Sequence, residues 1–127
     1  MQLQWTAWAT LAALLTYIWM IRNVGRMRMK LGIKAPEMNG PTEFLSVQRV
    51  QANTVEQMLL FFPALWMCAV FLGDKWAAAG GALWVVGRLM YALAYYREPR
   101  KRGPGFLLTV GASFLLMLGT VVGLIMH

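Results

Sequence analysis

Cysteine and histidine are almost missing from the 127-residue chain, which contains one of each. Because Cys68 is alone, it cannot form an intrachain disulfide, and its place in an apolar run is typical of a small packed residue. The only histidine is His127, so the sequence offers no set of side chains with metal-ligand spacing. A Ser-His or Cys-His nucleophile pair within the chain is excluded for the same reason.

Charged residues are also scarce, at 13% of the sequence, whereas 59% of the residues are hydrophobic. A soluble domain of this length could not bury so much apolar surface, so we expect an all-α integral membrane protein with a single domain over residues 1–127. The net charge of +7 comes largely from cations beside apolar segments, where they act as topology signals. No nucleic-acid partner is expected.

Four apolar segments predict a four-helix transmembrane bundle. The spans are expected at about residues 3–21, 43–72, 76–96 and 106–126. The polar segments 22–43 and 97–105 contain helix-breaking glycine and proline and are predicted to be loops. The first apolar segment has no basic region before it and reads as a retained helix rather than a signal peptide.

Cations are distributed unevenly between these predicted loops. The first loop holds five of the twelve lysines and arginines and the third holds four. Lys75 is the only one in the second, which is the tight turn Gly73-Asp74-Lys75 between the second and third spans. The positive-inside rule therefore predicts that the first and third loops are cytoplasmic and that both termini lie outside.

A polar stretch, residues 49–56, leads into the apolar part of the second span. At 100° per residue Arg49, Asn53 and Glu56 share one helix face, and Gln51 points elsewhere. Ionisable groups entering a span are costly and indicate a functional site. The alternative is that Arg49 and Glu56 belong to a structural ion-pair network, and spacing alone does not separate the two.

A second polar face is predicted on the third span at the same depth. Arg88, Tyr91 and Tyr95 fall on one side of that helix. The structural alternatives are that Arg88 pairs with Glu56 or with a helix end, and that both tyrosines belong to the interfacial aromatic belt. Together the two faces indicate an anion-recognising cavity that opens to the bilayer and suits one charged and one apolar ligand.

The order and spacing of these residues resemble the MAPEG family, the membrane-associated proteins of eicosanoid and glutathione metabolism. Three matching motifs carry the resemblance: Arg49-x-Gln51-x-Asn53-x-x-Glu56, Gly87-Arg88-x-x-Tyr91-x-x-x-Tyr95 and Arg102-Gly103. The similarity runs from about Gly25 to Leu118 and is strongest to bacterial members and microsomal glutathione transferases. It implies a homotrimer with glutathione, as co-substrate, bound between protomers near the cytoplasmic face.

The resemblance also implies a role for each matching residue. Arg102 would stabilise the glutathione thiolate, Glu56 would take the amine, and Gln51 would reach the ligand of the neighbouring subunit. A loop-one arginine of the family corresponds to Arg26 or Arg28. The residues that would hold the tripeptide are Arg49, Asn53, Glu56, Tyr91 and Tyr95. Gln57 departs from the eicosanoid-forming synthases, which have tyrosine there, so one ligand hydrogen bond is lost or replaced.

Three functions follow as hypotheses. The first is a membrane glutathione transferase, with peroxidase activity as a variant, acting on an apolar electrophile or lipid hydroperoxide in a bacterial inner membrane. The second is a non-catalytic lipid-binding scaffold of the lipoxygenase-activating-protein type. The third, a small transporter, fits less well because the polar residues cluster at one end of the spans and not at the midplane.

Overall fold

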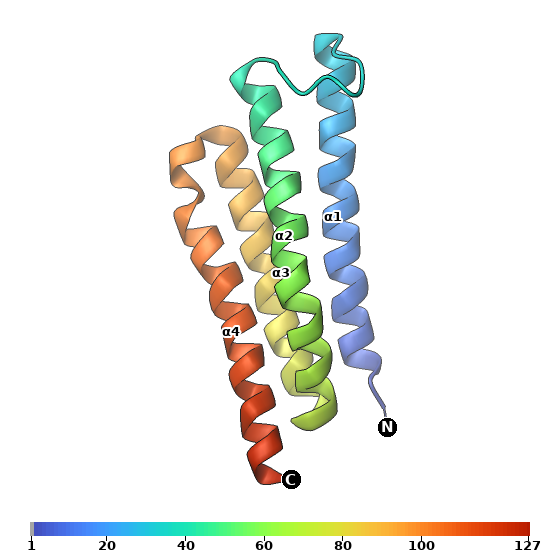
Figure 1. The fold of residues 1–127 in the computed structure, drawn as a ribbon, viewed down its shortest axis with the longest axis vertical. Coiled ribbons are helices and arrows are strands. Elements are labelled where there is room, and N and C mark those ends of the chain that lie inside the picture. Colours follow the sequence, from blue (N-terminus) through green and yellow to red (C-terminus); the bar gives the residue numbers. More distant parts are fainter. Residues whose placement is uncertain (1) are drawn as a thin grey trace.

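The computed structural model describes residues 2–127 as a bundle of four long helices (Figure 1). The helices are α1 (Gln4–Leu31), α2 (Thr42–Phe71), α3 (Asp74–Arg97) and α4 (Gly103–Met126), with the short 3-10 helix η1 (Pro99–Arg102) before α4. No strand occurs between residues 2 and 127. The predicted all-α, four-helix fold is therefore confirmed.

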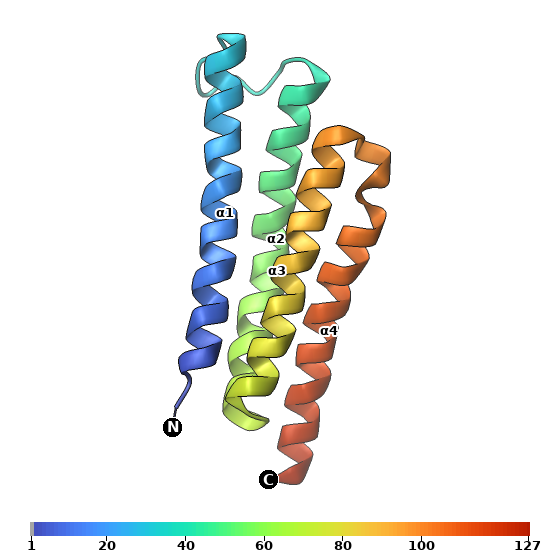
Figure 2. The same ribbon diagram turned by 180° about the vertical axis from the view of Figure 1, so that it is seen from behind.

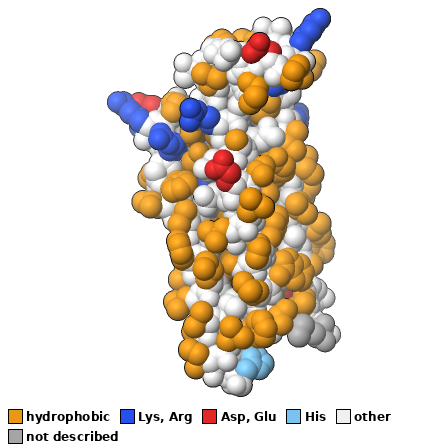
Figure 3. All heavy atoms as spheres, in the orientation of Figure 1, with side chains coloured by type: hydrophobic (Ala, Val, Ile, Leu, Met, Phe, Trp, Pro, Cys, Tyr) orange, Lys and Arg blue, Asp and Glu red, His pale blue; other side chains and the backbone are white. Residues whose placement is uncertain are grey.

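The surface and composition of the helices are those of an integral membrane protein. α2, α3 and α4 are long and apolar enough to cross a membrane. α1, with 28 residues, is long enough but is rich in Trp and Thr, which lower its hydropathy. Large apolar side chains such as Leu15, Leu59 and Ile125 are exposed on the outside of the bundle. Away from the end where the lysine and arginine side chains gather, the visible surface is mostly apolar (Figure 3).

The main difference from the prediction lies in the first polar segment. Residues 22–31 were expected to begin a loop, but α1 continues through them and ends only at Leu31. Arg, Met and Lys favour helix even where they are too polar to span a membrane. Gly32 then stops the helix with a left-handed φ of 68°, and its N–H donates to the Arg28 carbonyl.

The basic segments meet at one end of the bundle. Figures 1 and 2 show the α1–α2 loop and the α3–α4 turn at the same end, with both chain ends at the other. α1 and α2 reach further at this end than α3 and α4 do. Lysine and arginine side chains gather there in the space-filling view (Figure 3). We call this the basic end.

α1 is tied to α3 at the opposite end. The Asp74 carboxylate, in the first turn of α3, accepts hydrogen bonds from the backbone N–H of Trp5 (3.1 Å) and Thr6 (2.7 Å). The Thr6 hydroxyl also donates to it, at 2.7 Å. These bonds satisfy free N–H groups of the first turn of α1, which has no cap of its own.

Candidate functional site

A buried arginine organises the middle of the bundle. Arg88, on α3, is 0% exposed, and its Nε donates to the Thr109 hydroxyl of α4 at 3.0 Å. Its Nη1 donates to Asn53 Oδ1 (2.8 Å) and to the Thr54 hydroxyl (3.1 Å), both on α2. The expected ion pair with Glu56 is wrong, because Glu56 is exposed on α2 and Arg88 finds neutral oxygens instead. Arg88 thereby links three helices and fixes the amide of Asn53.

A row of cation and aromatic contacts runs from Arg88 toward the basic end. The Arg88 guanidinium lies over the Tyr91 ring, 4.2 Å from its centroid. The Tyr91 and Tyr95 rings meet edge to face with centroids 5.6 Å apart. The guanidinium of Arg102 lies 5.6 Å from the Tyr95 centroid. The shared face predicted for Arg88, Tyr91 and Tyr95 is therefore present, and both tyrosines are buried in the bundle rather than exposed as belt residues.

One cavity brings several of the predicted site residues together. Its volume is about 440 Å³. Its lining combines α2, α3, η1 and α4 through Asn53, Tyr91, Arg100, Arg102, Gly103 and Phe106. We call it the Arg102 cavity. The sequence had indicated Asn53, Tyr91 and Arg102, but not Phe106, whose ring lies 6.3 Å from that of Tyr91. The only available signal was its position as the first large apolar residue after the basic turn.

Arg102 differs from the two cations before it. Arg100 and Lys101 both form ion pairs with Glu98. Arg102 has no carboxylate partner among residues 2–127, and its Nη1 donates to the Pro99 carbonyl at 2.8 Å within η1. Its charge is therefore available to an anion in the cavity, whereas that of Arg100 is partly compensated.

Arg49 and Glu56 lie on the outer surface of α2. Both are exposed, and neither forms a salt bridge with any part of the chain that the structure describes. An ion pair between them is thus not observed among the described residues. Charged side chains on the outside of a membrane-spanning helix are costly unless protein, ligand or water surrounds them.

The two glutamines of the motif region are differently placed. The Gln51 side chain donates to the Tyr17 hydroxyl of α1 at 3.2 Å. Gln57 Oε1 is buried and has no hydrogen-bond partner among the described residues. Residue 57, where the family resemblance predicts a lost or replaced ligand hydrogen bond, therefore holds a buried acceptor without a partner among the described residues.

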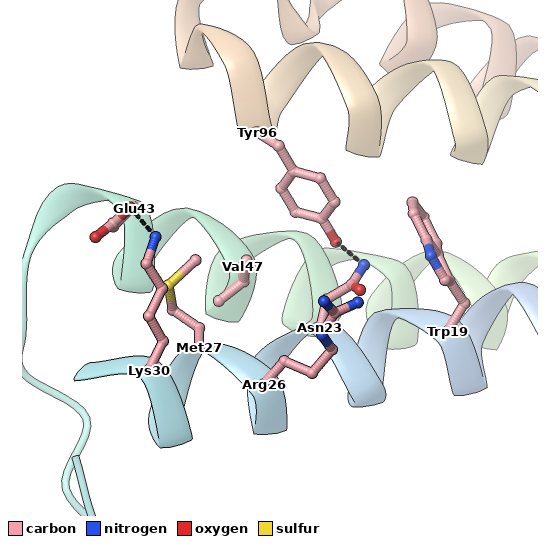
Figure 4. Close-up of a pocket in the computed structure, with 8 residues that line it drawn as sticks. All are labelled: Trp19, Asn23, Arg26, Met27, Lys30, Glu43, Val47 and Tyr96. Atoms are coloured by element: carbon pink, nitrogen blue, oxygen red, sulfur yellow. Dashed lines mark hydrogen bonds and ion pairs between the residues drawn. The ribbon is translucent and has the colours of Figure 1, made fainter. Parts of the chain in front are cut away.

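The two candidate arginines of α1 point to different surroundings. Arg28 donates to the Glu37 carbonyl at 2.7 Å and lies over the Phe44 ring, 5.0 Å from its centroid. Arg26 lines a second cavity, together with Asn23 and Tyr96 (Figure 4). Neither arginine lines the Arg102 cavity. Residues 2–127 contain no group of three or more His, Cys, Asp or Glu side chains that could hold a metal ion.

Comparison with known proteins agrees with the arrangement of these motifs. The model of the MAPEG family matches residues 6–122. An uncharacterised protein of Synechocystis sp. is 39% identical over 124 residues, which are 98% of this chain and 90% of that protein. Mouse microsomal glutathione S-transferase 2 is 36% identical over 101 residues, 80% of this chain and 69% of the transferase. Mouse leukotriene C4 synthase is 30% identical over 121 residues, 95% of this chain and 81% of the synthase.

The family match thus spans nearly all of the bundle, including α2, α3 and the η1–α4 turn that build the Arg102 cavity. Two of the three relatives carry glutathione-related or leukotriene-related names, and the third is uncharacterised. The chain belongs to the MAPEG family.

Proposed function

We propose that this protein is a membrane-bound glutathione transferase that conjugates glutathione to an apolar electrophile. The observation that carries the proposal is the guanidinium of Arg102, which has no carboxylate partner among residues 2–127 and lines one cavity with Asn53 and Tyr91. A guanidinium near a thiol favours the thiolate, which is the nucleophile. The names of the transferase and synthase relatives support the same reaction class.

In the proposed reaction, Arg102 acts on the thiol of glutathione. Arg102 lowers the pKa of the glutathione thiol below its ordinary value, so the proton passes to solvent before attack. The thiolate sulfur forms a bond with the electrophilic carbon, and the leaving group departs with its electron pair, for instance as chloride. Arg102 is the catalytic residue in this scheme.

Substrate binding is proposed to involve the exposed face of α2 as well as the Arg102 cavity. Arg49 and Glu56 lie on the same side of α2 as Asn53 and have no partners within the described protomer. We infer that Glu56 takes the glutathione amine, that Arg49 takes a carboxylate, and that Asn53, Tyr91 and Tyr95 hold the peptide between them. The amide of Asn53 is presented in one orientation because Arg88 binds its oxygen.

A homotrimer is proposed because one protomer leaves this face open. A second copy packed against α2 would cover the charged groups and complete the ligand site. Of the two α1 arginines, we favour Arg28 as the residue contributed to the neighbour's ligand, with Gln51. Arg26 instead lines a cavity inside its own protomer.

Orientation in the membrane is inferred from charge. The cations of the first and third connections gather at the basic end, so we propose that this end faces the cytoplasm of a bacterial inner membrane. Glutathione would then enter from the cytoplasm, and the apolar substrate would arrive through the bilayer.

The proposal is tested with purified protein in detergent. Glutathione binding is measured by calorimetry and conjugation of a chlorodinitrobenzene by absorbance. We expect Arg102→Ala to lower kcat/KM by about 100-fold, since it removes the charge that stabilises the thiolate. The pH at which bound glutathione forms thiolate, followed by ultraviolet absorbance, should rise. Arg49→Ala should weaken binding.

The matched control is Lys101→Ala, which removes the adjacent cation of η1 that pairs with Glu98 and does not line the Arg102 cavity. It should keep near-normal turnover. Equal losses in the two variants would contradict the role of Arg102. Absence of glutathione binding by the wild type would overturn the transferase and favour the non-catalytic lipid-binding scaffold.

A further inference from the structure

The second cavity lies at the basic end, between α1 and α3 with α2 as its floor (Figure 4). Its volume is about 620 Å³. Its lining consists of Trp19, Asn23, Arg26, Met27, Lys30, Glu43, Val47 and Tyr96. It shares no lining residue with the Arg102 cavity, so it is a separate feature of each protomer. We call it the α1–α3 cavity.

Its position on α2 separates it from the face that a second protomer is proposed to cover. Val47 lies at the floor of the cavity, whereas Arg49 and Glu56 are turned roughly 160–180° away from Val47 around the helix. On α1, Trp19 and Arg26 are likewise turned roughly 160–180° away from Arg28, the residue proposed to face the neighbour's ligand. The opening between α1 and α3 therefore lies on a side of the protomer away from Arg28 and from the Arg49–Glu56 face.

Positive charge predominates in this cavity. Arg26 has no carboxylate partner among the described residues. Lys30 pairs with Glu43 at 3.7 Å, but both side chains are about half exposed or more, and such pairs are weak. Two cations against one carboxylate leave the cavity positive, and Lys30 can exchange Glu43 for a stronger anion at little cost.

A hydroxyl donor accompanies the two cations. The Tyr96 oxygen accepts a hydrogen bond from the Asn23 amide at 3.1 Å, and Figure 4 shows these two side chains meeting across the opening. Because its oxygen is engaged as an acceptor, the Tyr96 O–H proton remains available for another acceptor. A phosphate group, with several acceptor oxygens and a negative charge, matches this combination of donors.

The side of the cavity further from the basic end is apolar and aromatic. Trp19 lies next to Tyr96, with ring centroids 5.9 Å apart. Further from the basic end, Leu15 on α1 and Leu89 and Leu93 on α3 are exposed and fall within about 60° of these aromatics around their helices. These exposed apolar side chains offer contact surface to an acyl chain, which a soluble phosphate compound would leave unused.

We propose that the α1–α3 cavity binds the phosphate headgroup of an anionic phospholipid, with its acyl chains along α1 and α3. Arg26, Lys30 and the Tyr96 hydroxyl contact the phosphate, and Trp19 marks the boundary with the hydrocarbon. Basic recesses between membrane helices on the cytoplasmic side are suited to such headgroups. The proposal concerns a different cavity from the glutathione site and stands without it.

Lipid retention by the full chain tests the proposal. Delipidated protein in detergent is titrated with phosphatidylglycerol, phosphatidylcholine or soluble glycerol phosphate, and bound molecules are counted by native mass spectrometry. We expect one phosphatidylglycerol per protomer and weaker binding of phosphatidylcholine. The double variant Arg26→Gln/Lys30→Gln should bind phosphatidylglycerol about ten-fold more weakly, because both attracting charges are lost.

Two controls and one further variant complete the test. Lys34→Gln, an equal charge change in the α1–α2 loop outside the cavity, should leave binding intact. The charge-preserving pair Arg26→Lys/Lys30→Arg should retain it, and Tyr96→Phe should lower it without changing charge. Circular dichroism checks that each variant is folded. Equal binding of the two lipids, equal binding by the double variant, or glycerol phosphate binding as tightly as lipid would each overturn the proposal.

Discussion

At the scale of single residues, the most consequential contact set belongs to Arg88. A guanidinium inside a membrane bundle ordinarily pairs with a carboxylate or a backbone carbonyl, but here an amide oxygen and two threonine hydroxyls serve instead. These acceptors are neutral, so the positive charge remains uncompensated beside Tyr91. Arg88 thus contributes a positive field to the Arg102 cavity while it holds Asn53 in place.

Removal of the Thr109 hydroxyl, which accepts a hydrogen bond from Arg88, should lower the free energy of unfolding measurably. In Thr109→Val, Arg88 Nε loses its partner in a buried site, and we expect a loss of about 1–2 kcal/mol. The control is Thr120→Val on the same helix, where the hydroxyl bonds only to the Leu116 carbonyl, with an expected cost below about 0.5 kcal/mol. Unfolding of both in detergent is followed by circular dichroism, and equal losses would contradict the role of Thr109.

Residue faces were more predictable than residue partners. Helical spacing alone put Arg88, Tyr91 and Tyr95 on one face, and the structure has them in a row. It could not identify Asn53, Thr54 and Thr109 as the partners of Arg88, because partners depend on the relative depth of three helices. A charge-based expectation offered Glu56 or a helix end as the partner, whereas the structure has neutral side-chain oxygens.

At the scale of helices, two glycines set the distance between α3 and α4. A Cβ on Gly105 would lie 2.6 Å from the Cα of Tyr91, and one on Gly87 would lie 2.8 Å from the backbone N of Thr109. Backbone atoms cannot move aside as a flexible side chain can. The close approach is therefore what brings Thr109 within reach of Arg88 and Phe106 beside Tyr91.

Gly105→Ala should force these helices apart. We expect a destabilisation of about 1–3 kcal/mol and weaker glutathione binding, because Tyr91 is displaced. Gly111→Ala on the same helix is the control: nothing lies within 4 Å of its added Cβ, and alanine favours helix by up to about 1 kcal/mol. Thermal unfolding and calorimetry measure both effects. A tolerated Gly105→Ala would contradict the close-packing argument.

The extra turns of α1 show where hydropathy stops being informative. The segment 22–31 is too polar to lie in hydrocarbon, so hydropathy predicts a loop there, yet its residues favour helix. Hydropathy distinguishes segments that lie in hydrocarbon from segments that lie in water. It does not distinguish a helix from a loop. The extension carries Arg26, Lys30 and part of one wall of the α1–α3 cavity, and therefore part of the proposed phospholipid site.

At the scale of the whole molecule, charge divides the bundle into two ends. The cations of both basic segments lie together, and the Asp74 contacts close the opposite end. This division was predictable, because loop cations are counted directly from the sequence. The Arg102 cavity was predictable only in part, since its walls come from four separate elements.

The orientation can be tested by cysteine labelling in a bacterial host. In a Cys68→Ala background, which removes the buried native thiol, single cysteines are introduced as Lys34→Cys and Lys75→Cys at exposed positions of opposite ends. A membrane-impermeant maleimide should label only Lys75→Cys in intact cells and both variants after lysis. Labelling of Lys34→Cys alone in intact cells would reverse the proposed orientation.

Because residues 2 and 127 lie at the same end of the bundle, successive copies can be fused head to tail without a linker that crosses the membrane (Figures 1 and 2). A chain of three such copies would encode the whole proposed trimer in one polypeptide. Arg102→Ala could then be placed in one, two or three copies of that polypeptide. If the three sites are independent, each altered copy should remove an equal share of the activity. If turnover at one site depends on turnover at the others, the first altered copy should remove most of it.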